Sequence, residues 1–597
     1  MMVTISHYRL VSIYLVILLL CHRAYISKAI WTRFDLVRDK LNGWGSNGNT
    51  PYIEISGEKG NGPKMSESDE FGSAVTRLGD VDGDGIEDIA IGARGEVNII
   101  KNFANYGLTS NLAYGAGAVY IFFMNKDGSV KNYTHICGDV NGGPTLFGKE
   151  HFGHALAPLG DLDGNGVPDL AVGAPGEEVA SVYILYLKTD GSVGNYTLIR
   201  GHVTGTVPYN ASQTMIKYNS TWSRAWIPNG PEIVYNCQFG SSLASIGDFN
   251  NDGVQDLAAG YFDISSGKSI IFFLYLKKNG TVISYKQITP GENGAPSFTY
   301  SHPMFGSSIV LLPDLDKDGI REIAVGAKYN DDKLTTHVRS GAVYVLYLNA
   351  DASIKKYSKI SELPLEDSQK GASELPLVAN DNCGAALTTL GDLNKDNTKQ
   401  HKPWLNYTAG DKNFGRVSMP DLIMGCPQPD MLGYTGRSFI IFLSQTAGLG
   451  SYKELLGSTD AGLKPALNEM DRFGTSISSY SDVDNNGIEE IIIGAPGSFS
   501  DGVKLAGKVY ILFLRRRRWH PFIPCTPCYI ASIAVPIGLC FLSCIGGIIF
   551  FFWYFRRKPD EIELIVVKSG VEITKDRKRK KKKFEKDSSK VYADEYA

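Results

Sequence analysis

Hydrophobic residues along the central part of this 597-residue chain come in short runs, separated by segments rich in glycine, aspartate and asparagine. Runs such as AVYIFF at 118–123 and SVYILYL at 181–187 are rich in β-branched and aromatic residues. Runs of this length, bounded by turn-forming residues, are typical of β-strands. We therefore expect an all-β fold with many turns in this part of the chain.

Two longer hydrophobic segments depart from this pattern. The first, Leu10–Cys21, follows basic side chains and precedes a small-residue motif ending at Ala29. It fits a signal peptide, 1–29, with an uncleaved anchor as the alternative. The second, 529–555, contains no charged residue and is long enough to cross a bilayer as one helix. Together they predict a secretory-pathway, single-pass type I protein of the cell membrane, with an extracellular N-terminus.

This topology divides the rest of the chain into an ectodomain at 30–514, a juxtamembrane segment at 515–528 and a basic cytoplasmic tail at 556–597. The run Arg515–Arg518 resembles a furin-type processing site, and contact with lipid head groups is the alternative. Six glycosylation sequons all fall in the ectodomain, as a surface glycoprotein requires. They lie at Asn132, Asn195, Asn210, Asn219, Asn279 and Asn406.

An internal repeat organises the ectodomain. Each copy begins with Phe-Gly or Cys-Gly, forms an alternating strand, and passes through an acidic loop into a hydrophobic strand. An aromatic-rich strand and a weaker fourth strand follow in most copies. The copies begin at Phe71, Phe152, Phe239, Phe305, Cys383 and Phe473. Four antiparallel strands per repeat predict a β-propeller, whereas a sandwich would need about seven strands per unit.

The sixth copy has only three strands, and the start of the ectodomain supplies a candidate for the fourth. The segment PYIEISGEKG at 51–60 precedes the first Phe-Gly as the fourth strands precede the other copies. We expect it to complete the last blade and close the ring without a free sheet edge. Six blades are predicted, with seven as the alternative if the insertion at 201–237 hides a degenerate blade.

Phe-Gly, the Asp-x-Asp-x-Asp-Gly-x-x-Asp loop and Gly-Ala-Pro together resemble the FG-GAP repeat of the integrin α-chain N-terminal propeller. The resemblance extends from about Tyr52 to Leu514. It implies a calcium-binding propeller that mediates cell adhesion or recognises an extracellular protein or glycan, on the face opposite the calcium hairpins. The predicted single-pass layout is similar to that of small FG-GAP membrane proteins of the LINKIN type.

One departure from integrin α chains leaves other roles open. No leg domains separate the propeller from the predicted span, so an integrin β-like partner is not supported. A structural subunit acting in cis within a membrane complex is one alternative. An accessory to a hydrolase is another, because FG-GAP propellers accompany GPI-specific phospholipase D.

Several function classes are not expected. Gly-x-Ser-x-Gly, His-Glu-x-x-His and phosphate-binding motifs are missing from the sequence, so we predict no catalytic residues, no organic cofactor and no enzyme activity. The chain carries a formal net charge of -3. With its basic residues concentrated in the tail, the acidic ectodomain does not predict nucleic-acid binding.

The acidic loops predict Ca²⁺ sites. Closely spaced carboxylates repel one another unless a cation joins them, and an all-oxygen set suits Ca²⁺ better than Zn²⁺. An EF-hand would need a glutamate at loop position 12, where the first loop has Ile91. The integrin-type loop instead uses an acid at position 9 and the backbone carbonyl at position 7. The resemblance implies these ligands: Asp80, Asp82, Asp84, Ile86 and Asp88; Asp161, Asp163, Asn165, Val167 and Asp169; Asp248, Asn250, Asp252, Val254 and Asp256; Asp314, Asp316, Asp318, Ile320 and Glu322; Asp482, Asp484, Asn486, Ile488 and Glu490.

The fifth copy differs from the others. Asn397 replaces the loop glycine, and an insertion separates the first acids from Asp421, so we leave this loop out of the predicted sites. In the same copy Cys383 replaces the phenylalanine of Phe-Gly, and Cys426 replaces the alanine of Gly-Ala. We hypothesise a disulfide between them, with two buried free thiols as the alternative.

Two long loops are candidates for ligand contact, Arg94–Gly117 and His202–Gln238. The second contains residue types favoured at binding hot spots, and anchoring of the loop by its tryptophans is the alternative. These residues are Tyr218, Trp222, Arg224 and Trp226.

Overall fold

The computed structural model describes residues 52–514, apart from 58, 100–111, 147, 177–179, 201, 205–229, 235–236, 299–301, 332–338, 362–374, 394–418, 429–434, 445, 457–466 and 501. All of them lie within the first of two units of the chain, Met1–Arg517. The signal peptide, the membrane span, Arg515–Arg518 and the tail expected from the sequence lie outside these residues. Within them, no helix is long and apolar enough to cross a membrane.

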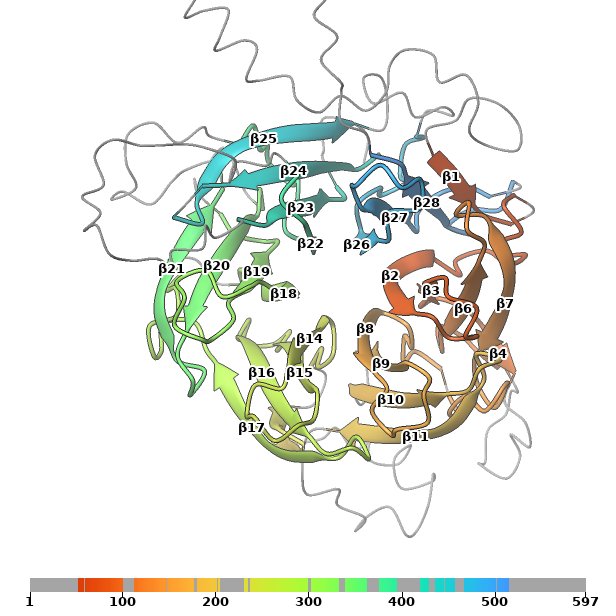
Figure 1. Cartoon of the computed structure of the whole chain (residues 1–597), viewed down its shortest axis with the longest axis horizontal. Coiled ribbons are helices and arrows are strands. Elements are labelled where there is room, and N and C mark those ends of the chain that lie inside the picture. The colour runs from red at the N-terminus through yellow and green to blue at the C-terminus, as the bar shows by residue number, and fades with distance from the viewer. Residues whose placement is uncertain are drawn as a thin grey trace, which may run out of the picture. The chain divides into compact units, whose positions relative to one another are not determined.

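Six four-stranded antiparallel sheets follow one another around a ring, as Figure 1 shows. The first blade contains β2 (Phe71–Gly79), β3 (Asp88–Ala93), β6 (Ala118–Met124) and β7 (Val130–Ile136). The second contains β8 (Ala155–Gly160), β9 (Asp169–Ala174), β10 (Ser181–Leu187) and β11 (Val193–Arg200). The third contains β14 (Leu243–Gly247), β15 (Asp256–Phe262), β16 (Ser269–Leu276) and β17 (Val282–Ile288).

The other three blades repeat this order. The fourth contains β18 (Phe305–Leu311), β19 (Ile323–Ala327), β20 (Ala342–Leu348) and β21 (Ile354–Ile360). The fifth contains β22 (Ala386–Leu390), β23 (Asp421–Cys426), β24 (Arg437–Leu443) and β25 (Leu449–Leu456). The sixth contains β26 (Ser476–Tyr480), β27 (Glu490–Ala495), β28 (Lys508–Leu512) and β1 (Tyr52–Ile55).

The innermost strand of each blade contacts the innermost strand of the next, from β2 through β8, β14, β18 and β22 to β26 and back to β2. This closed order confirms a six-bladed β-propeller. The seven-blade alternative is wrong. Where the 201–237 insertion is described, it contributes only β12 (His202–Thr204) and β13 (Glu232–Val234), which pair in parallel. A second small pair, β4 (Asn98–Ile99) and β5 (Leu112–Ala113), extends the first blade's β3–β6 connection.

The ring is closed by the two ends of the propeller, as the sequence predicted. Strand β1 pairs antiparallel with β28, with Tyr52 opposite Leu512 and Ile55 opposite Val509. Residues that precede the first blade in the sequence thus provide the outer strand of the last blade. No separate fourth strand after β28 is needed to complete that sheet.

The glycines of the repeat allow neighbouring blades to touch through their backbones. A Cβ placed on Gly92, the penultimate residue of β3, would lie 1.9 Å from the carbonyl oxygen of Gly153 in the next Phe-Gly. The corresponding distances in other blades, from Gly173 to Gly240 and from Gly326 to Gly384, are 2.1 and 2.0 Å. Any side chain at these positions would separate the blades, which explains why both glycines recur.

The phenylalanines of Phe-Gly fill the space between sheets. Phe71, Phe152 and Phe239 have no exposed surface. The Phe71 ring packs edge-on against Tyr120, with centroids 5.7 Å apart, and Phe152 packs against Tyr183 at 5.4 Å. Full burial of such a side chain contributes about 1.5–3 kcal/mol to folding.

Cys383 and Cys426 form a disulfide, which confirms the hypothesis for the fifth blade and excludes two free thiols. Phe71 and Ala93 lie opposite each other at the corresponding positions of the first blade. The two cysteines therefore replace a packed pair of the repeat with a covalent bond. Cys137 and Cys237 are buried free thiols.

Candidate functional site

Each acidic loop connects the first and second strands of a blade and is organised by its first aspartate. Asp80 accepts hydrogen bonds from the backbone N–H groups of Gly83 and Gly85, both at 2.8 Å. Asp161 accepts from Gly164 and Gly166 at 2.7 and 2.9 Å. The first carboxylate thus folds the loop around itself, and all four of these glycines have positive φ.

The ninth loop position has a different role. The buried carboxylate of Asp88 accepts hydrogen bonds from Val81 N, at 2.9 Å, and Met124 N, at 3.0 Å. It therefore joins the loop to the third strand of the blade. Asp169 and Asp256 make the equivalent pairs of hydrogen bonds, to Leu162 and Leu187 and to Phe249 and Leu276.

Four of the five predicted sites bring their acids together. Within each group, one ligand atom per residue lies within 4.8 Å of the others. The groups are Asp80, Asp82 and Asp88; Asp161, Asp163 and Asp169; Asp314, Asp316, Asp318 and Glu322; and Asp482, Asp484 and Glu490. In the third loop, Asp248, Asp252 and Asp256 do not form such a group. In this loop Asp252 N donates to Asp248 and Asn250, at 2.8 and 3.0 Å.

Burial and mutual repulsion both favour the protonated form of the ninth-position acids. Burial raises the pKa of Asp88, Asp169 and Asp256 to about 6 each, and neighbouring loop carboxylates contribute in the same direction. The same two causes raise the pKa of Glu322 to about 7 and that of Glu490 to about 9. A divalent cation would relieve this repulsion, so the all-oxygen donor sets fit a hard ion.

The remaining predicted ligands occupy two kinds of position. The side chains at loop position 7 pack into or against the blade cores, which fixes the loop backbone; they are Ile86, Val167, Val254, Ile320 and Ile488. Among the position-5 residues, Asn165 and Asn486 donate to the backbone oxygens of Leu187 and Leu514, at 3.0 and 2.7 Å.

Two lysines that sequence reasoning missed reach into the acidic loops. Lys131 Nζ lies 2.7 Å from Asp82 and 2.9 Å from Asp84. Lys355 forms ion pairs with Asp316, at 3.4 Å, and with Asp318. Both lysines follow the first residue of a fourth strand. That shared position is the only signal in the sequence that could have identified them.

In the fifth blade, Asp421 occupies the ninth-position role and makes one of the hydrogen bonds that the equivalent acids make in other blades. Its buried carboxylate accepts a hydrogen bond from Leu393 N at 2.8 Å, as Asp88 does from Val81. Asn397 and the other middle residues of this loop lie outside the described residues.

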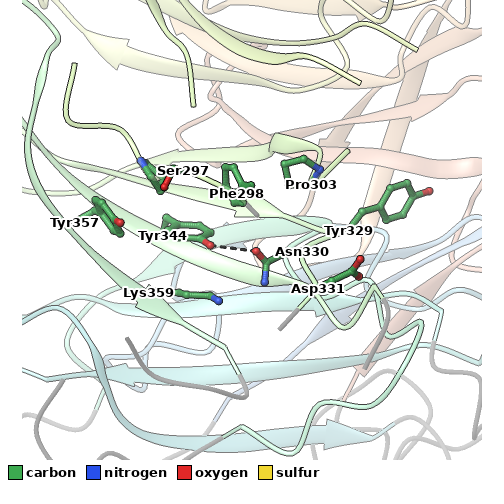
Figure 2. Close-up of a pocket in the computed structure, with 10 residues that line it drawn as sticks. Ser297, Phe298, Pro303, Tyr329, Asn330, Asp331, Tyr344, Tyr357 and Lys359 are labelled. Carbon is green, nitrogen blue, oxygen red and sulfur yellow. Dashed lines mark hydrogen bonds between the residues drawn. The ribbon is translucent and has the colours of Figure 1, made fainter. Parts of the chain in front are cut away.

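The opposite end of β19 from its acidic loop carries a pocket of about 120 Å³. Phe298, Tyr344 and Tyr357 form its aromatic part, and Figure 2 shows Lys359 and Asp331 beside them. The Tyr344 hydroxyl donates to Asn330 Oδ1 at 3.1 Å. Aromatic surface together with polar and charged groups is suited to a small polar part of a ligand.

The two long loops expected to contact a ligand are mostly outside the described residues. These include Tyr218, Trp222, Arg224 and Trp226, and the 100–111 segment of Arg94–Gly117. Their role stays a prediction.

Comparison with known proteins agrees with this architecture. The FG-GAP repeat model matches residues 71–122, 152–185, 305–346 and 473–512. Integrin alpha-PS2 of Drosophila melanogaster is 26% identical over 288 residues, covering 48% of this chain and 17% of that protein. Integrin alpha-4 of Xenopus laevis is 25% identical over 206 residues, covering 34% of this chain and 17% of that protein.

A third relative, Integrin alpha-PS3 of Drosophila melanogaster, is 34% identical over 116 residues, covering 19% of this chain and 9% of that protein. The matches thus span less than a fifth of each of these three relatives. The fold is a six-bladed β-propeller, and four of its blades contain a match to the FG-GAP repeat. More particularly, this propeller is similar to that of integrin alpha chains.

Proposed function

We propose that this chain is a single-pass cell-surface glycoprotein whose calcium-stabilised propeller recognises an extracellular protein or glycan. The observation that carries the proposal is the recurrence of acidic groups in the equivalent hairpin of four blades. The resemblance of the repeats to integrin alpha propellers supports a recognition role, and the hydrophobic segment at 529–555 supports the membrane topology.

In this proposal the calcium ions are structural. Each would be held by the acids at loop positions 1, 3 and 9, with position 5 and the carbonyl of position 7 completing the set. The ion would hold the hairpin closed and keep the buried position-9 acid ionised. The opposite end of the blades, which includes the pocket around Tyr344, is then free to bind a ligand.

The test is binding of the labelled, purified full chain to native cells and to extracellular matrix, with calcium and with chelator. We expect saturable binding that needs calcium. Tyr329→Ala, at the rim of the pocket, should weaken binding, whereas Tyr196→Ala on the outer strand β11 should not. A folded, calcium-loaded chain that binds neither cells nor matrix would contradict recognition and favour a structural role in cis.

A further inference from the structure

The first and fourth blades carry different side chains at structurally equivalent positions. Tyr120 in β6 lies opposite His135, and Tyr344 in β20 lies opposite Lys359. The Tyr120 hydroxyl donates to Glu96 Oε2 at 2.7 Å, where that of Tyr344 donates to Asn330. The position that carries Asn and Lys in the fourth blade therefore carries Glu and His in the first.

Cys137 completes a mixed cluster in the first blade. Single ligand atoms of Glu96, His135 and Cys137 lie within 4.8 Å of one another. Glu96 Oε1 is 2.7 Å from His135 Nε2, and the His135 ring stacks on Tyr120 with centroids 4.5 Å apart. Cys137 is 6% exposed and forms no disulfide. The cluster thus offers a carboxylate, an imidazole and a thiol from two elements, the β3–β6 connection and the end of β7.

A buried carboxylate beside the cluster lacks the arginine that its counterpart in the fifth blade has. Asp381 in the fifth blade pairs with Arg437, the first residue of β24. The corresponding first residue of β6 is Ala118, which lies opposite Ala93 as Arg437 lies opposite Cys426. The equivalent of Asp381 in the first blade is Asp69, two residues before Phe-Gly.

Asp69 is 4% exposed, and its Oδ1 has no hydrogen-bond partner among the described residues. Burial and the charge of Glu96 raise its pKa to about 6, although the backbone hydrogen bond from Ser66 and the positive charge of His135 act in the opposite direction. The first blade therefore has a set of three ligand atoms and, beside it, a buried carboxylate oxygen without a hydrogen-bond partner among the described residues.

We propose that Glu96, His135 and Cys137 bind a zinc ion, with the fourth position left to water. Sulfur and nitrogen ligands select zinc over calcium, so this site is chemically distinct from the acidic loops. Tetrahedral zinc with bonds of 2.0–2.3 Å holds its ligand atoms about 3.3–3.8 Å apart, within reach of this cluster. Binding replaces the thiol proton of Cys137, which passes to solvent.

The ion would tie the β3–β6 connection to the outer strand β7, at the end of the blade opposite the acidic loop. That connection leads into Arg94–Gly117, one of the loops expected to contact a ligand. The competing interpretation is a metal-free ion pair, in which protonated His135 lies between Glu96 and Cys137. The two interpretations differ in whether sulfur bonds to a metal.

Cobalt titration of the full chain, saturated with calcium and kept reduced, distinguishes them. We expect a thiolate-to-cobalt charge-transfer band at one equivalent, which zinc abolishes. Cys137→Ser should lose the band, whereas Cys237→Ser, which changes the other buried free thiol among the described residues, should keep it. His135→Gln should weaken cobalt binding by more than the roughly 10–100-fold that loss of an outer-shell partner costs.

Glu96→Gln keeps the thiol and the shape of the side chain, so it tests the site if Cys137→Ser fails to fold. It should retain the charge-transfer band with weaker cobalt affinity. Absence of the band from the wild-type chain would overturn the zinc site, as would an unchanged band in folded Cys137→Ser or unchanged affinity in Glu96→Gln. None of these three results bears on binding of the chain to cells, which is tested separately.

Discussion

At the scale of single residues, the carboxylates within one acidic loop have different structural roles. Asp80 orders the loop backbone, and Asp88 joins the loop to β6 while buried. Asp82 and Asp84 face the ammonium of Lys131. A calcium ion in the first loop must therefore compete with a cation that the protein itself supplies.

Replacing Lys131 with glutamine should strengthen calcium binding to the first loop by a few fold. The substitution removes the competing charge while leaving the carboxylates in place. Isothermal titration of the full chain with calcium measures the change. Lys126→Gln, which alters an exposed lysine of the preceding turn, is the matched control and should leave the affinity unchanged. Weaker binding by Lys131→Gln would show that the lysine instead preorganises the loop.

The carboxylates of these loops could be predicted from sequence because their spacing within a short segment is local. Lys131 could not, because it lies 49 residues from Asp82 and meets it only when β7 folds against the sheet. The same reason conceals the Glu96, His135 and Cys137 cluster. The third loop differs from the others in a way that the sequence does show, because position 3 is Asn250 where the other four predicted loops have aspartate.

At the scale of the strand, the fifth blade replaces a packing contact by a covalent one. The disulfide closes a loop of sequence separation 43, for which loss of the bond costs about 2–4 kcal/mol of folding free energy. Cys383→Ser should therefore lower the melting temperature measurably. The double variant Cys383→Phe and Cys426→Ala restores the pair found in other blades, so calorimetry should find it more stable than the single variant. Equal melting temperatures would show that the fifth blade cannot accommodate the ring.

The closing strand provides a second prediction at this scale. Ile55 of β1 has no exposed surface, whereas Ile53 is half-buried at the edge of the same core. Ile55→Ala should cost about 2–5 kcal/mol by leaving a cavity, and the control Ile53→Ala clearly less. Denaturant unfolding of the full chain measures both. Equal small effects would indicate that β1 contributes little to ring closure.

Most strands were predictable because alternation, aromatic content and glycine punctuation all agree in each repeat. The reason why the glycines recur in each repeat was not predictable from the sequence. Gly92 lies inside β3, one residue before its end, and against Gly153 of the next blade. Only the contact between blades explains it.

At the scale of the whole molecule, the ninth-position acids couple stability to pH. Their pKa values are raised on folding, from about 3.9 for Asp and 4.3 for Glu, to about 6 for Asp88 and about 9 for Glu490. At a pH between the unfolded-state and the folded-state pKa of such an acid, the folded chain holds a proton that the unfolded chain has lost. The free energy of unfolding therefore decreases as pH rises, by about 1.4 kcal/mol per pKa unit and group.

The calcium-free chain should consequently melt at a higher temperature at pH 5 than at pH 8. Calcium favours the ionised acids, so its addition should raise the melting temperature more at pH 8 than at pH 5. Differential scanning calorimetry with chelator or calcium at both values measures this. An equal rise in melting temperature at both pH values would show that the ninth-position acids do not take part in calcium binding. No rise at either pH would contradict the proposed calcium sites.

The number of blades and the closure of the ring followed from counting repeats and finding the missing strand at 51–60. These were predictable because each repeat forms the same local unit and packs against its neighbours. The pocket around Tyr344 was not, since it brings together Phe298, Asn330 and Lys359 from three separate segments. The insertions do not recur from one copy to the next, so their contribution to ligand contact stays a prediction.

The pairing of β1 with β28 also has a consequence for biosynthesis. Ribosomes make roughly 450 further residues after Ile55 before its partner Val509 exists. At 5–20 residues per second this takes about 20–90 s. Throughout that interval β1 lacks the strand with which it pairs in the folded propeller. Its backbone hydrogen-bonding edge therefore stays without its native partner until the last strand emerges.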